Sequence, residues 1–141
     1  MMIKAITLWQ PWASFMALDL KKNETRSWGT DYRGPLAIAA AVREPRTEIP
    51  IDVYVFGIEK LGPFKSWPRG GILCVRNLYS TVYDPFKPVD PVEAMLGFYG
   101  PGRVAWRTRM LKVFDEPIPV KGKQGLWDWE WPDEMRVELL C

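Results

Sequence analysis

The sequence predicts an α+β domain in which a bent, mixed β-sheet of five to seven strands carries a helix directly after its first strand. Apolar and polar residues alternate with a period of two in several segments separated by Gly- and Pro-containing turns, which is typical of strands. One early segment instead repeats its apolar residues at spacings of three and four, which is typical of a helix. This pattern favours a sheet that curls toward a barrel, and the length of 141 residues predicts one domain spanning 1–141.

The N-terminal segment contains the first predicted strand, residues 3–8, and the one clear helix. Pro11 suits the first helical position because its missing N–H would have no partner there. We expect the helix to end near Leu18, since Asp19 would otherwise fall on the apolar face, where a carboxylate is costly. Asp19 is expected in the left-handed conformation that often ends a helix. The apolar face consists of Trp12, Phe15 and Met16.

A charged strand is predicted from Glu24 to Trp28. Strand side chains alternate between faces, so Glu24, Arg26 and Trp28 share one side of this strand. Lys21 lies in the preceding turn, where its long side chain reaches the same space. The pattern predicts that an amine, a carboxylate, a guanidinium and an aromatic plane converge. The alternative is a solvated, charged edge strand with the helix docked behind it.

The middle of the chain is less regular. Residues 36–42 form a nearly continuous apolar run, which predicts a strand buried on both faces. Prolines interrupt residues 43–68, where we expect loops around a short helix or an irregular apolar flap. A strand is predicted over 72–83, broken or bulged near Arg76, and one or two helical turns over 91–96.

The last third predicts a strand over 103–114, a loop over 116–119 and a Gly-rich basic rim over 121–125. This rim lacks the strand–loop–helix context of a phosphate-binding P-loop. One face of the strand carries three arginines, which suit either anion binding or pairing with carboxylates: Arg103, Arg107 and Arg109. A final half-buried strand is expected to point three tryptophans inward: Trp127, Trp129 and Trp131. The acidic tail after Pro132 is expected to pack loosely.

Composition limits the chemistry. A net charge of +2 is lower than that of most proteins that hold long nucleic acids by their phosphates, which favours a small ligand or a short oligonucleotide. Eight tryptophans offer planes for stacking bases. The absence of histidine excludes Ser-His-Asp and Cys-His nucleophiles and His-ligated zinc, so neither a metal nor a cofactor is expected. Cys74 is expected as a buried thiol. With no signal peptide and no membrane-length apolar run, we expect a cytoplasmic protein without a membrane partner.

The segment L-K-K-N-E-T-R resembles the signature of the ASCH family, small domains with a PUA-like barrel, whose pattern is Gly-x-Lys-x-x-Glu-x-Arg. Lys21, Glu24 and Arg26 match it, and Asp19 occupies the glycine position. T-L-W-Q-P-W-A, G-G-I-L-C-V and E-P-I-P-V-K-G-K-Q-G-L-W also resemble ASCH proteins, in the same order. The resemblance implies a PUA-like fold. It also implies one of the family's activities: RNA binding, ribonuclease action, or amidohydrolysis that removes the acyl group of N4-acetylcytidine.

Residues around the first helix could bind a base. A pyrimidine could stack on Trp9, Trp12 or Trp28, and Trp12 could equally belong to the core. Gln10 could read a base edge, since an amide both donates and accepts. It could instead bond the unpaired backbone amides at the helix start.

Acid–base chemistry is assigned to Lys21, Glu24 and a second carboxylate. Buried near Arg26, Lys21 would lose proton affinity and act as a base or nucleophile. Glu24 would shuttle a proton to the leaving amine, or would hold Lys21 charged to stabilise an oxyanion. The amidohydrolase relatives have threonine at the Glu24 position and a separate glutamate farther along, for which chain order suggests Glu93. Arg26 would orient Glu24 or bind substrate oxygen.

The leading hypothesis is therefore a metal-independent amidohydrolase that removes N4-acyl groups from cytosine nucleosides. The alternatives are a module that binds single-stranded RNA through Arg107 and its neighbours, and a metal-independent ribonuclease. The ligand in each case is a modified pyrimidine nucleoside or short single-stranded RNA. The sequence sets no oligomeric state.

Overall fold

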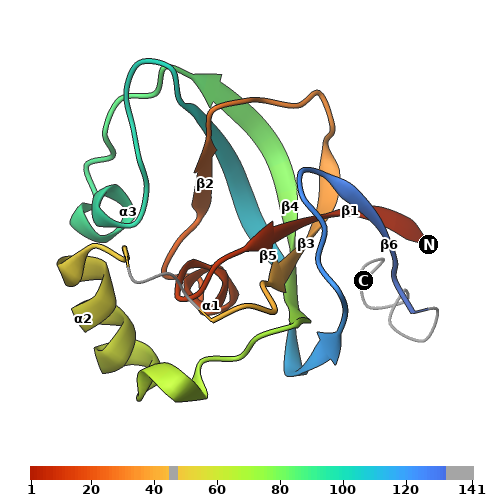
Figure 1. Cartoon of the computed structure of the whole chain (residues 1–141). Coiled ribbons are helices and arrows are strands. Elements are labelled where there is room, and N and C mark those ends of the chain that lie inside the picture. The colour runs from red at the N-terminus through yellow and green to blue at the C-terminus, as the bar shows by residue number, and fades with distance from the viewer. Residues whose placement is uncertain (45–47, 133–141) are drawn as a thin grey trace.

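The computed structural model describes residues 1–44 and 48–132, which form a six-stranded mixed sheet with helices on one side (Figure 1). The strand order is β2-β5-β4-β3-β1-β6. β1 and β3 pair in parallel, and the other neighbours pair antiparallel. The predicted α+β class is thus confirmed. The strands are β1 (Met2–Leu8), β2 (Asn23–Arg26), β3 (Gly34–Ala40), β4 (Gly71–Tyr83), β5 (Val104–Pro119) and β6 (Trp127–Glu130).

The helices are α1 (Trp12–Ala17), α2 (Ile51–Leu61) and α3 (Pro91–Met95), with a 3₁₀ turn at Phe64–Ser66. The expected end of α1 is confirmed, because Leu18 is its C-cap and Asp19 has a φ of 60°. Pro11 is the N-cap and not the first helical residue. The segment expected to hold a short helix or an irregular flap forms the 11-residue α2.

The sheet is strongly bent because the long pair β4–β5 changes register three times. One of these shifts lies between Val75 and Arg76, at the predicted bulge. The sheet does not close into a barrel: β2 and β6 are its edges and do not pair with each other within the described ranges. β5 also continues through the segment 116–119 that was expected to be a loop, since Ile118 pairs with Ile72 of β4.

The core consists of three apolar clusters. Two lie on opposite faces of the sheet, and the three C-terminal tryptophans face inward in one of them, as predicted. The third joins the helices through Phe15 of α1, Val53 of α2 and Leu96 at the end of α3. Figure 1 shows α1 between α2 and the strands. The tail expected to pack loosely, from residue 133 onward, lies outside the described residues.

None of the helices described is both long and apolar enough to cross a bilayer.

Candidate functional site

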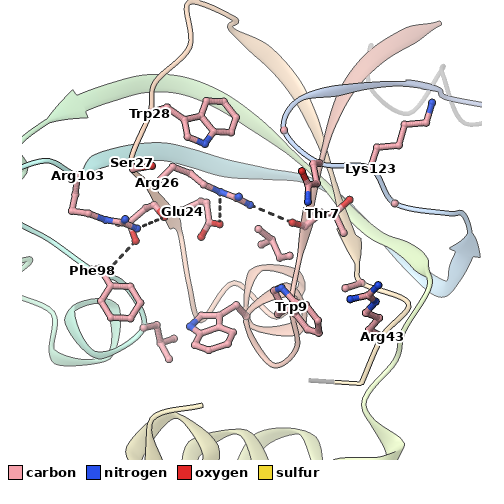
Figure 2. Close-up of a pocket in the computed structure, with 18 of the residues that line it drawn as sticks. Thr7, Trp9, Glu24, Arg26, Ser27, Trp28, Arg43, Phe98, Arg103 and Lys123 are labelled. Atoms are coloured by element: carbon pink, nitrogen blue, oxygen red, sulfur yellow. Dashed lines mark hydrogen bonds and ion pairs between the residues drawn. The ribbon is translucent and has the colours of Figure 1, made fainter. Parts of the chain in front are cut away.

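A cavity of about 900 Å³ lies where the curled sheet stays open, between the C-terminal end of β1 and the edge strand β2 (Figure 2). The loop between β5 and β6 and the segment after β3 complete its rim. This volume is within the range of small-molecule sites. The polar and aromatic side chains that define it are Thr7, Trp9, Trp12, Glu24, Arg26, Trp28, Arg43, Phe98, Arg103 and Lys123.

A chain of polar contacts crosses the opening of the sheet. Glu24 of β2 places Oε2 3.1 Å from Nε of Arg26. Nη2 of Arg26 donates to the carbonyl of Thr7 on β1, at 3.3 Å. These contacts are drawn at the centre of Figure 2. One guanidinium therefore bridges two strands that share no backbone hydrogen bonds, and it holds the Glu24 carboxylate in the cavity wall.

Lys21 lies behind that wall and is fully buried. Nζ donates to the carbonyls of Asn23 and Leu96 and lies 3.7 Å from Oε1 of Glu24. Burial lowers the pKa of Lys21 from its ordinary value, and the nearby Glu24 and Glu93 carboxylates offset only part of this effect. The amine does not line the cavity. It contacts two residues of the cavity wall, the Glu24 carboxylate and the Leu96 carbonyl.

Aromatic planes form much of the remaining wall. Trp9, Trp12 and Trp28 all line the cavity, together with Phe98. Trp28 is 37% exposed and stands edge-on to Trp106, with ring centroids 4.9 Å apart. Nε1 of Trp106 donates to the Trp28 carbonyl at 3.0 Å, which fixes the Trp28 backbone. The exposed indole of Trp28 is thus held in place on a buried neighbour.

Three cations in the wall were not assigned to the site from the sequence. Arg103 donates from Nη2 to the carbonyl of Thr25 at 3.0 Å and lies over the ring of Phe98. Arg43 and Lys123 stand exposed at the rim, on the opposite side from Arg103 in Figure 2. Lys123 belongs to the basic loop that was predicted to be a rim, whereas Arg43 and Phe98 reach the cavity only through long-range folding.

The other residues proposed from the sequence lie away from the cavity. The Gln10 amide is buried and bonds Ser14 N, Ser14 Oγ and the carbonyl of Pro68, which fits its alternative role at the helix start. Glu93 accepts hydrogen bonds from the backbone amides of Lys22 and Asn23, where β2 begins. Arg107 is exposed on β5, with its guanidinium over the ring of Tyr79.

Asp19 occupies the position of the glycine in the ASCH pattern, and the structure supplies a reason for an aspartate. Its carboxylate lies 2.9 Å from Nη2 of Arg76, a fully buried residue of β4. Arg76 also donates to the carbonyl of Met16 and to Oγ1 of Thr108. The left-handed residue at the end of α1 therefore gains an ion pair that a glycine could not make.

No protein-family model and no curated protein matches this chain. The ASCH assignment therefore remains a proposal. Among the described residues, no group of three or more Cys, Asp and Glu side chains could hold a metal ion.

The arrangement suits a flat ligand that carries a polar or anionic group. Among the described residues of the wall, Glu24 is the one carboxylate, and it is available as a proton acceptor and donor. Arg26 and Arg103 place donors at either side of it, which could bind a developing oxyanion. The tryptophans offer faces for a base to stack on.

Proposed function

We propose that the protein is a cytoplasmic, ASCH-like amidohydrolase that removes N4-acyl groups from cytosine nucleosides. The observation that supports the proposal is the contact of Glu24 with Lys21 behind it and with Arg26 beside it, because this carboxylate lines a cavity walled by tryptophans. Such a site combines a stacking surface for a pyrimidine with a single acid–base group next to it.

In the proposed reaction Glu24 takes a proton from a water molecule as the water oxygen adds to the acyl carbonyl carbon. Arg26 stabilises the resulting oxyanion by donating hydrogen bonds. The bond between that carbon and N4 then breaks, and Glu24 returns the proton to the departing exocyclic nitrogen. The products are a carboxylic acid and cytidine, so atoms and charge balance without a further reactant.

Lys21 acts in this proposal as a positioning residue and not as a nucleophile. Its Nζ is surrounded by Asn23 O, Leu96 O and Glu24 and lies outside the cavity wall. The amine orients the carboxylate from behind, which leaves the other carboxylate oxygen with Arg26. Glu93 supports the same strand through backbone amides and has no direct part in the chemistry.

The test is deacylation of N4-acetylcytidine by the purified protein, followed by chromatography of the cytidine released. Glu24→Gln keeps the size of the side chain and removes the acid–base group, and we expect a loss of at least about 100-fold in kcat. Arg109→Ala, an exposed change outside the cavity, is the matched control and retains full activity. Absence of turnover by the wild-type protein on any N4-acyl cytosine nucleoside or nucleotide would overturn the proposal.

One observation favours a second candidate, the binding of single-stranded RNA. The guanidinium groups of Arg107 and Arg109 both lie over the Tyr79 ring, 5.6 and 4.5 Å from its centroid, on an outer face of β4 and β5. This candidate predicts salt-sensitive binding of a short RNA that Arg107→Ala weakens. RNA cleavage in the same incubations would instead support a ribonuclease, and no binding at low salt would exclude this candidate.

A further inference from the structure

The cavity contains more positive charge than hydrolysis of a neutral nucleoside requires. Four cationic side chains line it and face one carboxylate: Arg26, Arg43, Arg103 and Lys123. The whole chain has a formal charge of only +2, so its positive charge is concentrated here. A cleft lined by one sign of charge attracts ligands of the other sign.

Two of these cations have partners among the described residues and two do not. Arg26 is paired with Glu24, and Arg103 is held by the Thr25 carbonyl and the Phe98 ring. Arg43 and Lys123 make no ion pair or hydrogen bond with any other described residue. They come from different parts of the chain and line the side of the cavity opposite Arg103, with Lys123 above and Arg43 below in Figure 2.

Lys123 is placed beside the cavity because the backbone of its neighbour Gly122 packs closely against the Thr7 side chain. A Cβ added to Gly122 would lie 2.6 Å from Oγ1 of Thr7, so the loop between β5 and β6 packs directly against the end of β1. Thr7 is held in turn, since Nε1 of Trp127 donates to its hydroxyl at 3.1 Å. A side chain at position 122 would push the loop outward and carry Lys123 away from the cavity.

We infer that the ligand carries a phosphate monoester, and that the Arg43–Lys123 end of the cavity binds it. The substrate class is then an N4-acylated cytidine 5′-monophosphate, with its base among the tryptophans beside Glu24. This inference rests on the proposed function and narrows its substrate from nucleoside to nucleotide. A single nucleotide suits a cavity of about 900 Å³ better than a long strand, which would need an extended basic groove.

The first test compares the binding of cytidine and cytidine 5′-monophosphate by calorimetry. Two charge-assisted contacts should make the nucleotide bind at least about tenfold more tightly than cytidine. The Arg43→Gln/Lys123→Gln double variant should reduce that advantage to less than about threefold. Lys121→Gln, an exposed lysine of the same loop that does not line the cavity, is the control and should retain the full advantage.

A second variant tests the placement of Lys123 without removing a charge. Gly122→Ala should reduce the nucleotide advantage, because its Cβ displaces the loop from Thr7. Circular dichroism and the thermal unfolding midpoint establish whether each variant is folded, and a variant that fails to fold is replaced by the single change Lys123→Gln. Raising the salt concentration should weaken nucleotide binding more than cytidine binding.

Equal affinity for cytidine and its monophosphate would overturn the inference, and so would a nucleotide advantage that survives in the double variant. Much tighter binding of the dinucleotide cytidylyl-cytidine would assign the cations to an RNA phosphodiester and would also overturn it. These outcomes are distinct from failure of the proposed function, because the probes carry no acyl group. A nucleotide preference without deacylation would support the phosphate site and overturn the proposed hydrolase activity.

Discussion

Lys21 contacts the carboxylate of the candidate site without lining the cavity itself. Its motif spacing predicted that it would meet Glu24, and the two groups do lie 3.7 Å apart. The sequence did not reveal that Leu96 and Asn23 would enclose the amine, because Leu96 is distant in the chain and arrives there through α3. Local spacing predicts which groups meet, whereas the choice of which one faces the ligand depends on long-range packing.

The lowered pKa of Lys21 predicts a pH-dependent contribution to stability. The folded state binds the Lys21 proton less strongly than the unfolded state does, so between the folded pKa and 10.5 the unfolded state holds more protons. The free energy of unfolding therefore rises with pH through that window. We expect urea denaturation to show wild type gaining stability relative to Lys21→Met as the pH increases toward 10.5.

Lys22→Met, at the exposed neighbouring position, provides the control, and its difference from wild type should stay constant over the same range. A difference between wild type and Lys21→Met that is flat, or that falls with pH, would contradict a lowered pKa for the buried amine.

Cys74 is a second residue whose environment could be predicted from the sequence. The apolar run around it predicted a buried thiol, and it is fully buried in β4, where burial raises its pKa to about 12. Because the thiolate is the reactive form, we expect Cys74 to resist a thiol reagent at about pH 8 in the native protein. In a Cys141→Ser background, labelling should occur only after denaturant is added. Rapid native labelling would contradict this environment.

At the scale of elements, α1 depends on an arginine that the sequence analysis did not assign to it. The apolar spacing and the position of Asp19 were enough to predict the helix and its end. The residue that satisfies that end, Arg76, lies on β4. Sequence showed only a polar break in an apolar strand, which was interpreted as a bulge. A buried cation and its partner across 57 positions leave no local periodicity to detect.

Removing Arg76 should therefore loosen α1 from the sheet. Arg76→Ala leaves the Met16 carbonyl and the Thr108 hydroxyl without this donor and opens a cavity, so we expect the free energy of unfolding to fall by about 3–5 kcal/mol. Chemical denaturation measures the change, and Arg109→Ala, which removes only an exposed contact with the Tyr79 ring, should change it by less than about 1 kcal/mol. Similar stability of the two variants would show that Arg76 does not hold α1.

At the scale of the whole molecule, the alternating strands were enough to predict a bent mixed sheet, but not where it would stop closing. β2 has only four residues and, among the described strands, pairs only with β5, so the edge beside the cavity is short. Among the described residues, the hydrogen bond from Arg26 to the carbonyl of Thr7 is the one that joins β2 to β1. Barrel closure depends on strand length and register over the entire sheet, which no single segment of the sequence reports.

The unclosed edge of the sheet at β2 should therefore be the part of the sheet that unfolds locally most often. Arg26→Ala removes the bridge and one partner of Glu24, and we expect amide hydrogen exchange in β2 to accelerate by about tenfold or more. The amides of β3, which is buried between β1 and β4, should exchange faster only to the extent that global stability falls slightly. Thr30→Ala, a partly buried change in the loop after β2, tests whether any substitution nearby has this effect. Equal acceleration in β2 and β3 would mean that the sheet opens as a single unit, and that the cavity does not lie at a separately mobile edge.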